Sequence, residues 1–334
     1  ANWYAANRMR PFVEAGLFAD ISDVWAANGL NEALASSVPS STIDGKQYAI
    51  PYTYYQWGIY YNRDAYAAAG VEPPAADATV DWATFIANCE KFKAAGIDCV
   101  TTGSVAKWPV AGIFDYLSLR TNGYQFHADL AAGKVSWTSP ETRAVFAEFA
   151  KLQPFVTENH AAIDWQDAAA IFTQGKAAHY VMGNFAVGVF KEGGMTNDNL
   201  GFMVFPEITP GIARAEEAPT DTIHLTSGAK NPEDAKLFLA YMASAEAQSK
   251  WNSAVGQLPT NKNATVDAAD PFLSEGFAAL STATGGIAQF WDRDADAEYA
   301  SLGMDGFQQF LVQPEELEAI LERLEQARLR LYPQ

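Results

Sequence analysis

The residues with the clearest potential for chemistry form an aromatic run over 50–62, which contains five tyrosines and a tryptophan. β-Branched and aromatic residues favour extended backbone, and Pro51 and Gly58 are incompatible with a helix here. Because side chains alternate between the faces of a strand, Tyr55 and Trp57 should point to the same side. The run is therefore either a packed central strand or a strand whose aromatic face lines a ligand cleft.

A second candidate group lies in the glycine-preceded segment 285–294, where Trp291, Asp292 and Arg293 are adjacent. The C–H face of a pyranose ring packs on aromatic rings, while its hydroxyls bond to carboxylate and guanidinium groups. Two glycines give the backbone the freedom to approach a ligand closely. The segment is either a solvated loop with one anchoring ring or part of a sugar site. We favour the sugar site, with the Trp291 ring stacked on the ligand.

Motifs for catalysis, phosphate binding and metal binding are missing from the sequence. The four histidines are dispersed, and there is no H-x-x-x-H pair, nucleophile elbow or phosphate-binding glycine loop. Asp292, Asp294 and Asp296 resemble the start of a calcium loop, but Ala297 replaces the required glycine. We therefore expect no cofactor, no metal and no catalytic residues. A glycan-processing enzyme that uses two of the many carboxylates stays open as the alternative, because sequence cannot give their separation.

Length and composition restrict the fold and the partners. A chain of 334 residues with 49% hydrophobic residues is long enough for two lobes with substantial cores. A net charge of −18 repels phosphate backbones and anionic lipid, so nucleic acid and membrane surfaces are not expected partners. No apolar run has the length needed to cross a bilayer.

Short predicted strands alternate with predicted helices, which indicates an α/β fold with a mixed sheet. Helices are expected over 81–96 and 165–174 and from residues 140, 232 and 314, and strands over 97–102, 177–182 and 201–206. Cys89 lies in the first of these helices and Cys99 in the strand after it. The two are either free buried thiols or a pair that staples the helix to the strand.

Several motifs, taken together, are specific to one family. They are EAGLFADI at 14–21, DGKQYAIP at 44–51, YYNRD at 60–64, Trp82 with Phe85, FTQGKAA at 172–178, MGNF at 182–185 and AKNPEDA at 229–235. In these passages the chain resembles the sugar-type extracellular solute-binding proteins of bacterial ABC importers, the family that includes maltose-binding protein. The resemblance covers nearly the whole chain.

The resemblance implies a type II periplasmic binding protein fold, with two α/β lobes, three crossings and a ligand cleft between the lobes. Residues 1–56 would belong to lobe 1, 57–221 to lobe 2, 222–258 to the return into lobe 1, and 259–334 to lobe 2 with the C-terminal helices. The family pattern also leads us to expect that the first β-α-β motif of lobe 1 is missing from this sequence.

The resemblance also extends the set of expected site residues. It places Trp108, Phe185 and Trp291 as aromatic platforms on lobe 2, and Tyr55 and Asp221 at crossings, while Trp3 or Tyr4 matches a lobe 1 aromatic. The full predicted ligand-binding set is Trp3, Tyr4, Tyr55, Trp57, Trp108, Phe185, Asp221, Trp291, Asp292 and Arg293. Three other tryptophans are predicted to be core residues, namely Trp82, Trp137 and Trp165.

The function implied is that of a non-catalytic, monomeric binding protein. It would capture a carbohydrate, such as a disaccharide or an α-glucoside, and deliver it to the permease subunits of an ABC importer. Family members are exported, so we expect a periplasmic location with the signal peptide removed. Because the periplasm is oxidising, and the strand after the predicted helix should run back along it, we predict a disulfide between Cys89 and Cys99.

Overall fold

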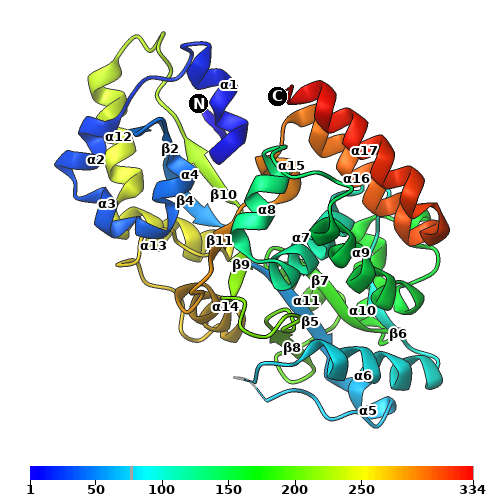
Figure 1. Ribbon diagram of the computed structural model, residues 1–334. Coiled ribbons are helices and arrows are strands. Elements are labelled where there is room, and N and C mark those ends of the chain that lie inside the picture. The colour runs from blue at the N-terminus through cyan, green and yellow to red at the C-terminus, as the bar shows by residue number, and fades with distance from the viewer. Residues whose placement is uncertain (76–77, 334) are drawn as a thin grey trace.

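Two β-sheets organise the molecule, and a computed structural model describes residues 1–75 and 78–333 of it (Figure 1). The first sheet has the antiparallel order β1-β10-β4, formed by Asn2–Tyr4, Thr220–Ile223 and Ile50–Tyr54. The helices around it, which complete lobe 1, are α1 (Ala6–Glu14), α2 (Ser22–Ala27), α3 (Leu30–Ala33), α4 (Val38–Ser41), α12 (Pro232–Ala243) and α13 (Ala245–Val255).

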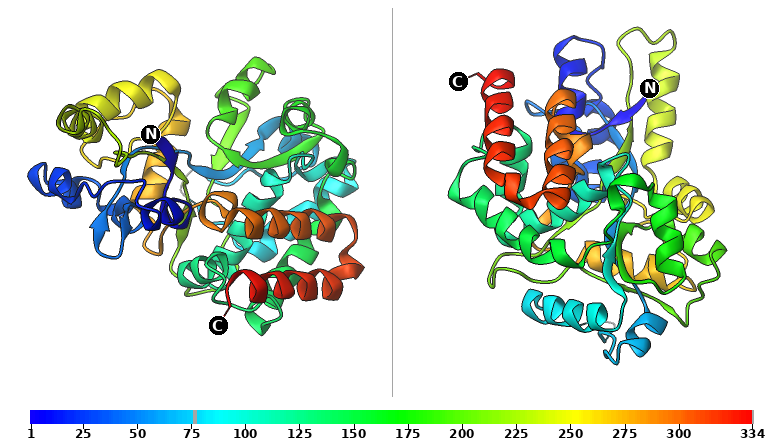
Figure 2. Two further views of the ribbon diagram at one scale, coloured as in Figure 1. Left: turned by 90° about the horizontal axis from the view of Figure 1, so that it is seen from above. Right: turned by 90° about the vertical axis from the view of Figure 1, so that its right-hand side faces the viewer.

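The second sheet is mixed, as predicted, and has the order β6-β7-β5-β8. Its strands are Asp98–Thr101, Ala177–Gly183, Trp57–Asn62 and Leu200–Met203; β6 and β7 are parallel, and β5 is antiparallel to both of its neighbours. The helices of this lobe 2 are α5 (Arg63–Ala68), α6 (Trp82–Ala94), α7 (Trp108–Thr121), α8 (Tyr124–Ala131), α9 (Pro140–Leu152), α10 (Trp165–Thr173), α11 (Ala186–Glu192), α15 (Trp291–Asp294), α16 (Ala297–Val312) and α17 (Leu317–Leu331). Figure 2 shows the two groups of elements side by side, with a few segments passing between them.

The chain passes between the sheets at neighbouring places. β4 ends at Tyr54 and β5 begins at Trp57, so the aromatic run is two strands with a short connection rather than one strand. β9 (Ala215–Glu217) pairs in parallel with β11 (Gly286–Ala288) and leads into β10, while Leu258 bridges to Tyr54 before α14 (Pro271–Ser281). The lobe boundaries expected from the sequence stay a prediction.

Local signals account for most helix ends. The Asp81 carboxylate accepts the backbone N–H of Thr84 at 2.9 Å and caps α6, and Ser139 caps α9 in the same way. Helix α7 has no side-chain cap. Every residue from Pro109 to Arg120 is buried, so the sequence of this helix also lacks the apolar spacing of a helix with one exposed face. Trp108 is therefore the first residue of a buried helix.

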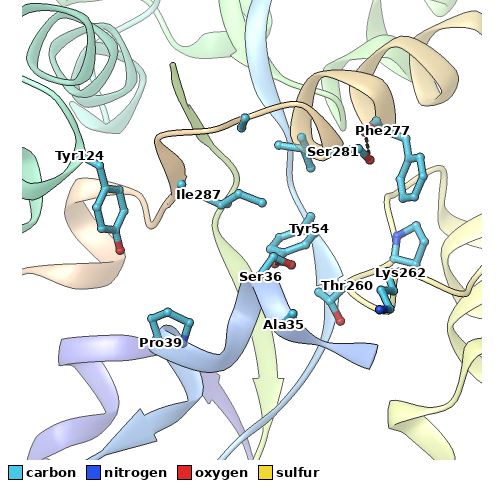
Figure 3. Close-up of a pocket in the computed structure, with 14 residues that line it drawn as sticks. Ala35, Ser36, Pro39, Tyr54, Tyr124, Thr260, Lys262, Phe277, Ser281 and Ile287 are labelled. Carbon is cyan, nitrogen blue, oxygen red and sulfur yellow. Dashed lines mark hydrogen bonds between the residues drawn. The ribbon is translucent and has the colours of Figure 1, made fainter. Parts of the chain in front are cut away.

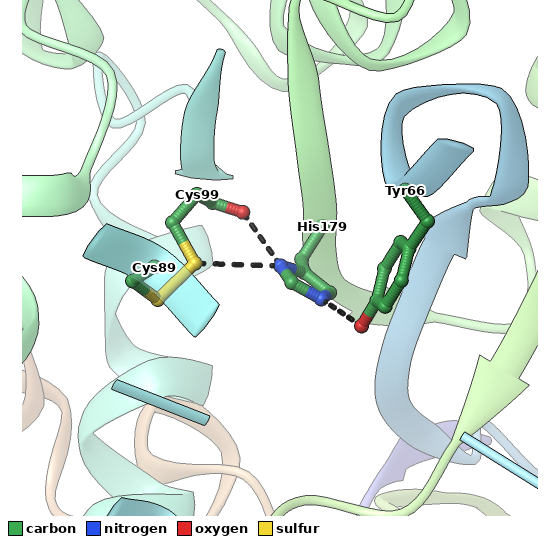
Figure 4. Close-up of a disulfide and its surroundings, with 4 residues drawn as sticks. All are labelled: Tyr66, Cys89, Cys99 and His179. Atoms are coloured by element: carbon green, nitrogen blue, oxygen red, sulfur yellow. Dashed lines mark hydrogen bonds between the residues drawn. A yellow bond between two sulfur atoms is a disulfide. The ribbon is translucent and has the colours of Figure 1, made fainter. Parts of the chain in front are cut away.

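The predicted disulfide is confirmed: Cys89 of α6 is bonded to Cys99 of β6 (Figure 4). His179 of β7 lies against it, and burial lowers the pKa of this imidazole to about 4. The neutral ring donates from Nδ1 to the Cys99 carbonyl at 2.7 Å and accepts the Tyr66 hydroxyl at Nε2, also at 2.7 Å. In the described part of the chain, no helix is both long and apolar enough to cross a membrane.

Candidate ligand-binding site

An aromatic pocket of about 290 Å³ lies between the two sheets, where the chain crosses from one to the other. We call it the aromatic pocket throughout. Seven of its lining side chains are aromatic, and these are Tyr4, Tyr55, Trp57, Trp108, Trp165, Phe185 and Phe290. Pro219, Asp292 and Arg293 complete the lining. Such a concentration of flat apolar faces with a few polar groups is typical of small-molecule sites.

Trp57, at the start of β5, is the centre of the aromatic wall. Its ring centroid lies 4.7 Å from that of Phe290, 5.9 Å from that of Trp108 and 6.2 Å from that of Phe185. Space for these rings depends on Gly183 at the end of β7, since a Cβ there would lie 2.4 Å from the Phe185 ring. The wall is thus assembled from several elements of lobe 2.

The polar part of the pocket is an ion pair with two aromatic neighbours. Arg293 of α15 donates to Oδ1 of Asp221 in β10 at 2.8 Å, and the Tyr55 hydroxyl donates to Oδ2 of the same carboxylate at 2.8 Å. The guanidinium lies over the rings of Tyr4 and Tyr55, 4.9 and 5.2 Å from their centroids. Burial, followed by the Asp221 charge, raises the pKa of Tyr55, so its hydroxyl remains a donor.

Asp292 lines the pocket and has one carboxylate oxygen that the protein itself does not use. Its Oδ1 is buried and has no hydrogen-bond partner among the described residues. Burial raises the pKa of this carboxyl group, and the charges of Arg293 and Arg8 oppose the rise. A buried oxygen without a partner is costly, but this one has almost no accessible surface, so a ligand hydroxyl reaches it only when neighbouring side chains move.

Seven of the ten predicted site residues line the aromatic pocket: Tyr4, Tyr55, Trp57, Trp108, Phe185, Asp292 and Arg293. Asp221 lies behind them and holds Arg293 and Tyr55. Trp3 lines a different cavity, and its indole N–H donates to the Arg8 carbonyl at 3.3 Å. Of the two adjacent lobe 1 aromatics, Tyr4 is therefore the one that faces the pocket.

Trp291 requires a correction. Its side chain is 0% exposed, and its indole N–H donates to the Ala300 carbonyl at 3.1 Å. The ring packs in the core of lobe 2 against Trp137 and Phe307, whose centroids lie 5.5 Å away. The expectation that this ring faces a ligand is wrong, because the start of α15 turns it inward and leaves Phe290 toward the pocket.

Sequence reasoning missed three lining residues, Trp165, Phe290 and Pro219. Trp165 was expected in the core, as Trp82 and Trp137 were; the last two are buried, but Trp165 is only partly so. It is the first residue of α10, directly after the Asp164 cap. A tryptophan at the first position of a capped helix lies at an end rather than along a packed stripe, and this signal was available.

A larger cavity of about 550 Å³ lies elsewhere, between α14 and the segment around Ser36 (Figure 3). Most of its polar side chains are already paired: the Tyr54 hydroxyl bonds to Ser36 and Ser37, and Lys262 binds Glu32 at 2.9 Å. Thr260 likewise donates to the Pro51 carbonyl. The aromatic pocket, with its seven rings and the Arg293–Asp221 pair beside them, is the better candidate despite its smaller volume. Across residues 1–75 and 78–333 no cluster of side chains suits a metal ion.

Solved structures with the same fold bind sugars. The bacterial solute receptor AcbH, described as having an exclusive preference for β-D-galactopyranose, superposes with a TM-score of 0.86 at 28% identity, over 99% of this chain and 84% of that one. A chitin oligosaccharide binding protein superposes with a TM-score of 0.82 over 98% of this chain and 82% of its own, but at 19% identity it supports the fold alone.

The curated relatives are longer than the part of them that this chain matches. An uncharacterized ABC transporter extracellular-binding protein of Pyrococcus horikoshii is 27% identical over 282 residues, which is 84% of this chain and 62% of the relative. A probable sugar-binding periplasmic protein of Mesorhizobium japonicum is 28% identical over 185 residues, 54% of this chain and 42% of the relative. The chain thus spans less than two thirds of each of these relatives.

The family model for bacterial extracellular solute-binding proteins matches residues 1–249. That match includes both sheets, the crossing at Tyr55 and most of the aromatic wall, and the superpositions give the same two-lobe fold. The chain belongs to the bacterial extracellular solute-binding protein family.

Proposed function

We propose that this chain is the substrate-binding protein of an ABC sugar importer and that it holds a carbohydrate in the aromatic pocket. The observation that carries the proposal is the pocket itself: seven aromatic side chains, the Arg293–Asp221 pair and the unpaired Asp292 oxygen lie together between the lobes. The rings offer stacking faces for a pyranose, and the polar groups offer both donors and acceptors for its hydroxyls.

A neutral sugar suits this pocket better than an anionic one. Arg293 is already paired with Asp221, and Asp292 lines the same pocket, so the positive charge is balanced before a ligand arrives. The chain as a whole carries a net charge of −18, which further disfavours an anion. The galactopyranose preference described for AcbH makes D-galactose a natural first probe.

In this proposal the two lobes close on the sugar by a hinge motion and present one combined surface to the permease subunits. The protein would act as a monomer in the periplasm after export. It binds its ligand without transforming it, and no residue is assigned a catalytic role. The competing function, a glycosidase with a carboxylate pair, predicts product formation from the same sugars.

Calorimetry and thermal shift with D-galactose, D-glucose, lactose and maltose test the proposal. A sugar present at 100 times its Kd should stabilise the folded protein by ~2.7 kcal/mol. Trp108→Ala, which removes part of the aromatic wall, should abolish most of that effect. Phe238→Ala is the matched control, since Phe238 is 53% exposed on α12 in lobe 1 and does not line the pocket. Binding of none of these sugars, or release of hydrolysis products from lactose or maltose, would overturn the proposal.

A further inference from the structure

The larger cavity, which lies between α14 and the segment around Ser36, has walls from both lobes (Figure 3). The opposite wall to α14 comes from lobe 1, through η1 (Ala35–Ser37) and α4, and its lining residues are Ala35, Ser36 and Pro39. On the other side, Tyr124 belongs to α8 of lobe 2, and α14 is anchored by Phe272 in the lobe 2 core. A molecule held in this cavity would therefore contact both lobes.

The passages of the chain between the lobes separate the larger cavity from the aromatic pocket. Tyr54 ends β4 and Tyr55 follows it, and side chains alternate along extended backbone. The Tyr54 side chain lines the larger cavity, and that of Tyr55 lines the aromatic pocket. In the same way Ile287 of β11 lines the larger cavity, while Phe290, further along that segment, lines the aromatic pocket. The two spaces thus lie on opposite sides of the passages.

The lining of the larger cavity suits an uncharged, mainly apolar ligand. Phe277, Leu280 and Ile287 supply apolar surface to it. Two of them, Phe277 and Ile287, are only partly buried, so a ligand that covers them removes apolar surface from water. None of the described residues that line the cavity is acidic, and its one basic side chain, Lys262, is paired with Glu32. The cavity therefore offers no unpaired charge to an ionic ligand.

Tyr124 offers one polar contact at the edge of this apolar space. Its side chain is only partly buried, and Figure 3 shows its hydroxyl without a hydrogen bond to the other lining residues. The other hydroxyls of the lining are engaged; that of Ser281, for example, donates to the Phe277 carbonyl at 2.7 Å. Burial, followed by the Asp294 charge, raises the pKa of Tyr124, so its hydroxyl stays protonated and can donate. A ligand with one acceptor oxygen fits this arrangement.

The volume of the larger cavity indicates the size of its ligand. At about 550 Å³ it falls within the range of roughly 300–1,000 Å³ that is usual for small-molecule sites. A closed apolar cavity of about 150 Å³ is enough to hold a single benzene ring. The larger cavity therefore has room for a molecule of about two fused rings together with its acceptor oxygen.

We propose that the larger cavity binds an uncharged, mainly apolar molecule of about two fused rings, and that this molecule strengthens ligand binding in the aromatic pocket. The coupling follows from the position of the two spaces. A hinge motion about the passages between the lobes brings the walls together on one side and separates them on the other. A molecule that fills the larger cavity therefore opposes the reopening of the aromatic pocket. The coupling rests on the proposed sugar-binding function, whereas the site itself does not.

Calorimetry with 1-naphthol, an uncharged two-ring molecule with one hydroxyl, tests the site, and 1-naphthoate, which carries a carboxylate, tests the role of charge. The wild-type protein should bind 1-naphthol and not 1-naphthoate. Ala35→Trp and Ala283→Trp, which add bulk from the two walls, should abolish binding. Ala278→Trp is the matched control, because Ala278 is an exposed residue of α14 that does not line the cavity. Tyr124→Phe should weaken 1-naphthol binding roughly 2–10-fold, the worth of one neutral hydrogen bond.

The coupling is measured as the Kd of a bound sugar with and without saturating 1-naphthol. The probe should lower that Kd at least ~5-fold, and the sugar should lower the Kd of 1-naphthol by the same factor, because coupling between two sites is reciprocal. An unchanged sugar Kd would overturn the coupling.

Three results would overturn the site itself. They are no binding of 1-naphthol, binding that both cavity variants leave unchanged, and competition between 1-naphthol and the sugar, which would place the probe in the aromatic pocket. Equal binding of 1-naphthoate would overturn the assignment of an uncharged ligand. Binding of 1-naphthol without binding of D-galactose, D-glucose, lactose or maltose would instead refute the proposed sugar-binding function and leave the site standing.

Discussion

Exchanging Trp291 and Trp108 for alanine, one at a time, separates a core tryptophan from a pocket tryptophan. Trp291 is fully buried, and its indole makes a hydrogen bond to Ala300. Truncating such a residue typically costs 3–5 kcal/mol of stability. For 334 residues that unfold as one unit, the unfolding entropy near 60 °C is ~0.7 kcal/mol/K. Trp291→Ala should therefore lower Tm by ~4–7 °C, with sugar affinity in the surviving folded protein close to that of the wild type.

Trp108→Ala should give the opposite result. Its ring is only partly buried and lines the aromatic pocket. Loss of a central aromatic anchor typically costs ~2 kcal/mol or more of binding free energy, which is a rise in Kd of about 30-fold. Differential scanning calorimetry and titration calorimetry on the same preparations measure both quantities, and Trp291→Phe serves if Trp291→Ala does not fold. A Trp291→Ala protein with the wild-type Tm and no sugar binding would refute the reasoning.

Three further predictions concern stability. Reduction of the Cys89–Cys99 bond, which closes a loop with a sequence separation of 10, should lower the unfolding free energy in urea by ~2.7 kcal/mol; two reactive thiols in the unreduced, denatured protein would contradict it. Burial raises the pKa of Asp294 from 3.8 to about 6, because the folded protein favours the neutral carboxyl group. The stability that this preference contributes is complete below pH 3.8 and is lost as the pH rises to 6. Between pH 3.8 and pH 6 the unfolding free energy of the wild type should therefore fall by up to ~3 kcal/mol because of this group, and Asp294→Asn should not show that fall. The same slope of unfolding free energy against pH in wild type and variant would count against the prediction. His179, with its pKa lowered from 6.5 to about 4, contributes in the other direction. Its stabilisation is complete above pH 6.5 and is lost as pH falls to 4, which is up to ~3 kcal/mol of unfolding free energy. His179→Gln should not show that loss when unfolding by urea is measured across this pH range. A variant whose unfolding free energy falls as steeply as that of the wild type would disprove the prediction.

Features that depend on residues close together in the chain could be predicted from the sequence. The alternation of Tyr55 and Trp57 placed both side chains in one pocket, although the chain between β4 and β5 is not a continuous strand. The disulfide followed from a helix and a strand that are consecutive in the chain, so that Cys89 and Cys99 have Cα atoms 4.9 Å apart. In both cases the geometry of one or two neighbouring elements was enough.

The sequence pattern could not show that Phe290, and not Trp291, lines the aromatic pocket. Phe290 has extended backbone, with ψ at 143°, and α15 starts at the next residue. The direction of each ring depends on that start, and a helix of four residues has too few positions to reveal its phase by apolar spacing.

The contacts among Arg293, Asp221 and Tyr55 could not be predicted from the sequence, because they depend on how distant segments pack together. Asp221 faces Tyr55 because β10 pairs with β4, and Arg293 reaches Asp221 because α15 packs on α7 and α16 of lobe 2. The three residues come from three separate segments of the chain, each next to a passage between the sheets. The Arg293–Asp221 pair therefore joins the lobe 1 sheet to a lobe 2 helix at the position where we propose that a sugar binds. In the proposed function, a sugar stacked on Tyr55 would contact a direct partner of this pair, so binding and the relative position of the lobes would be linked through the same few side chains.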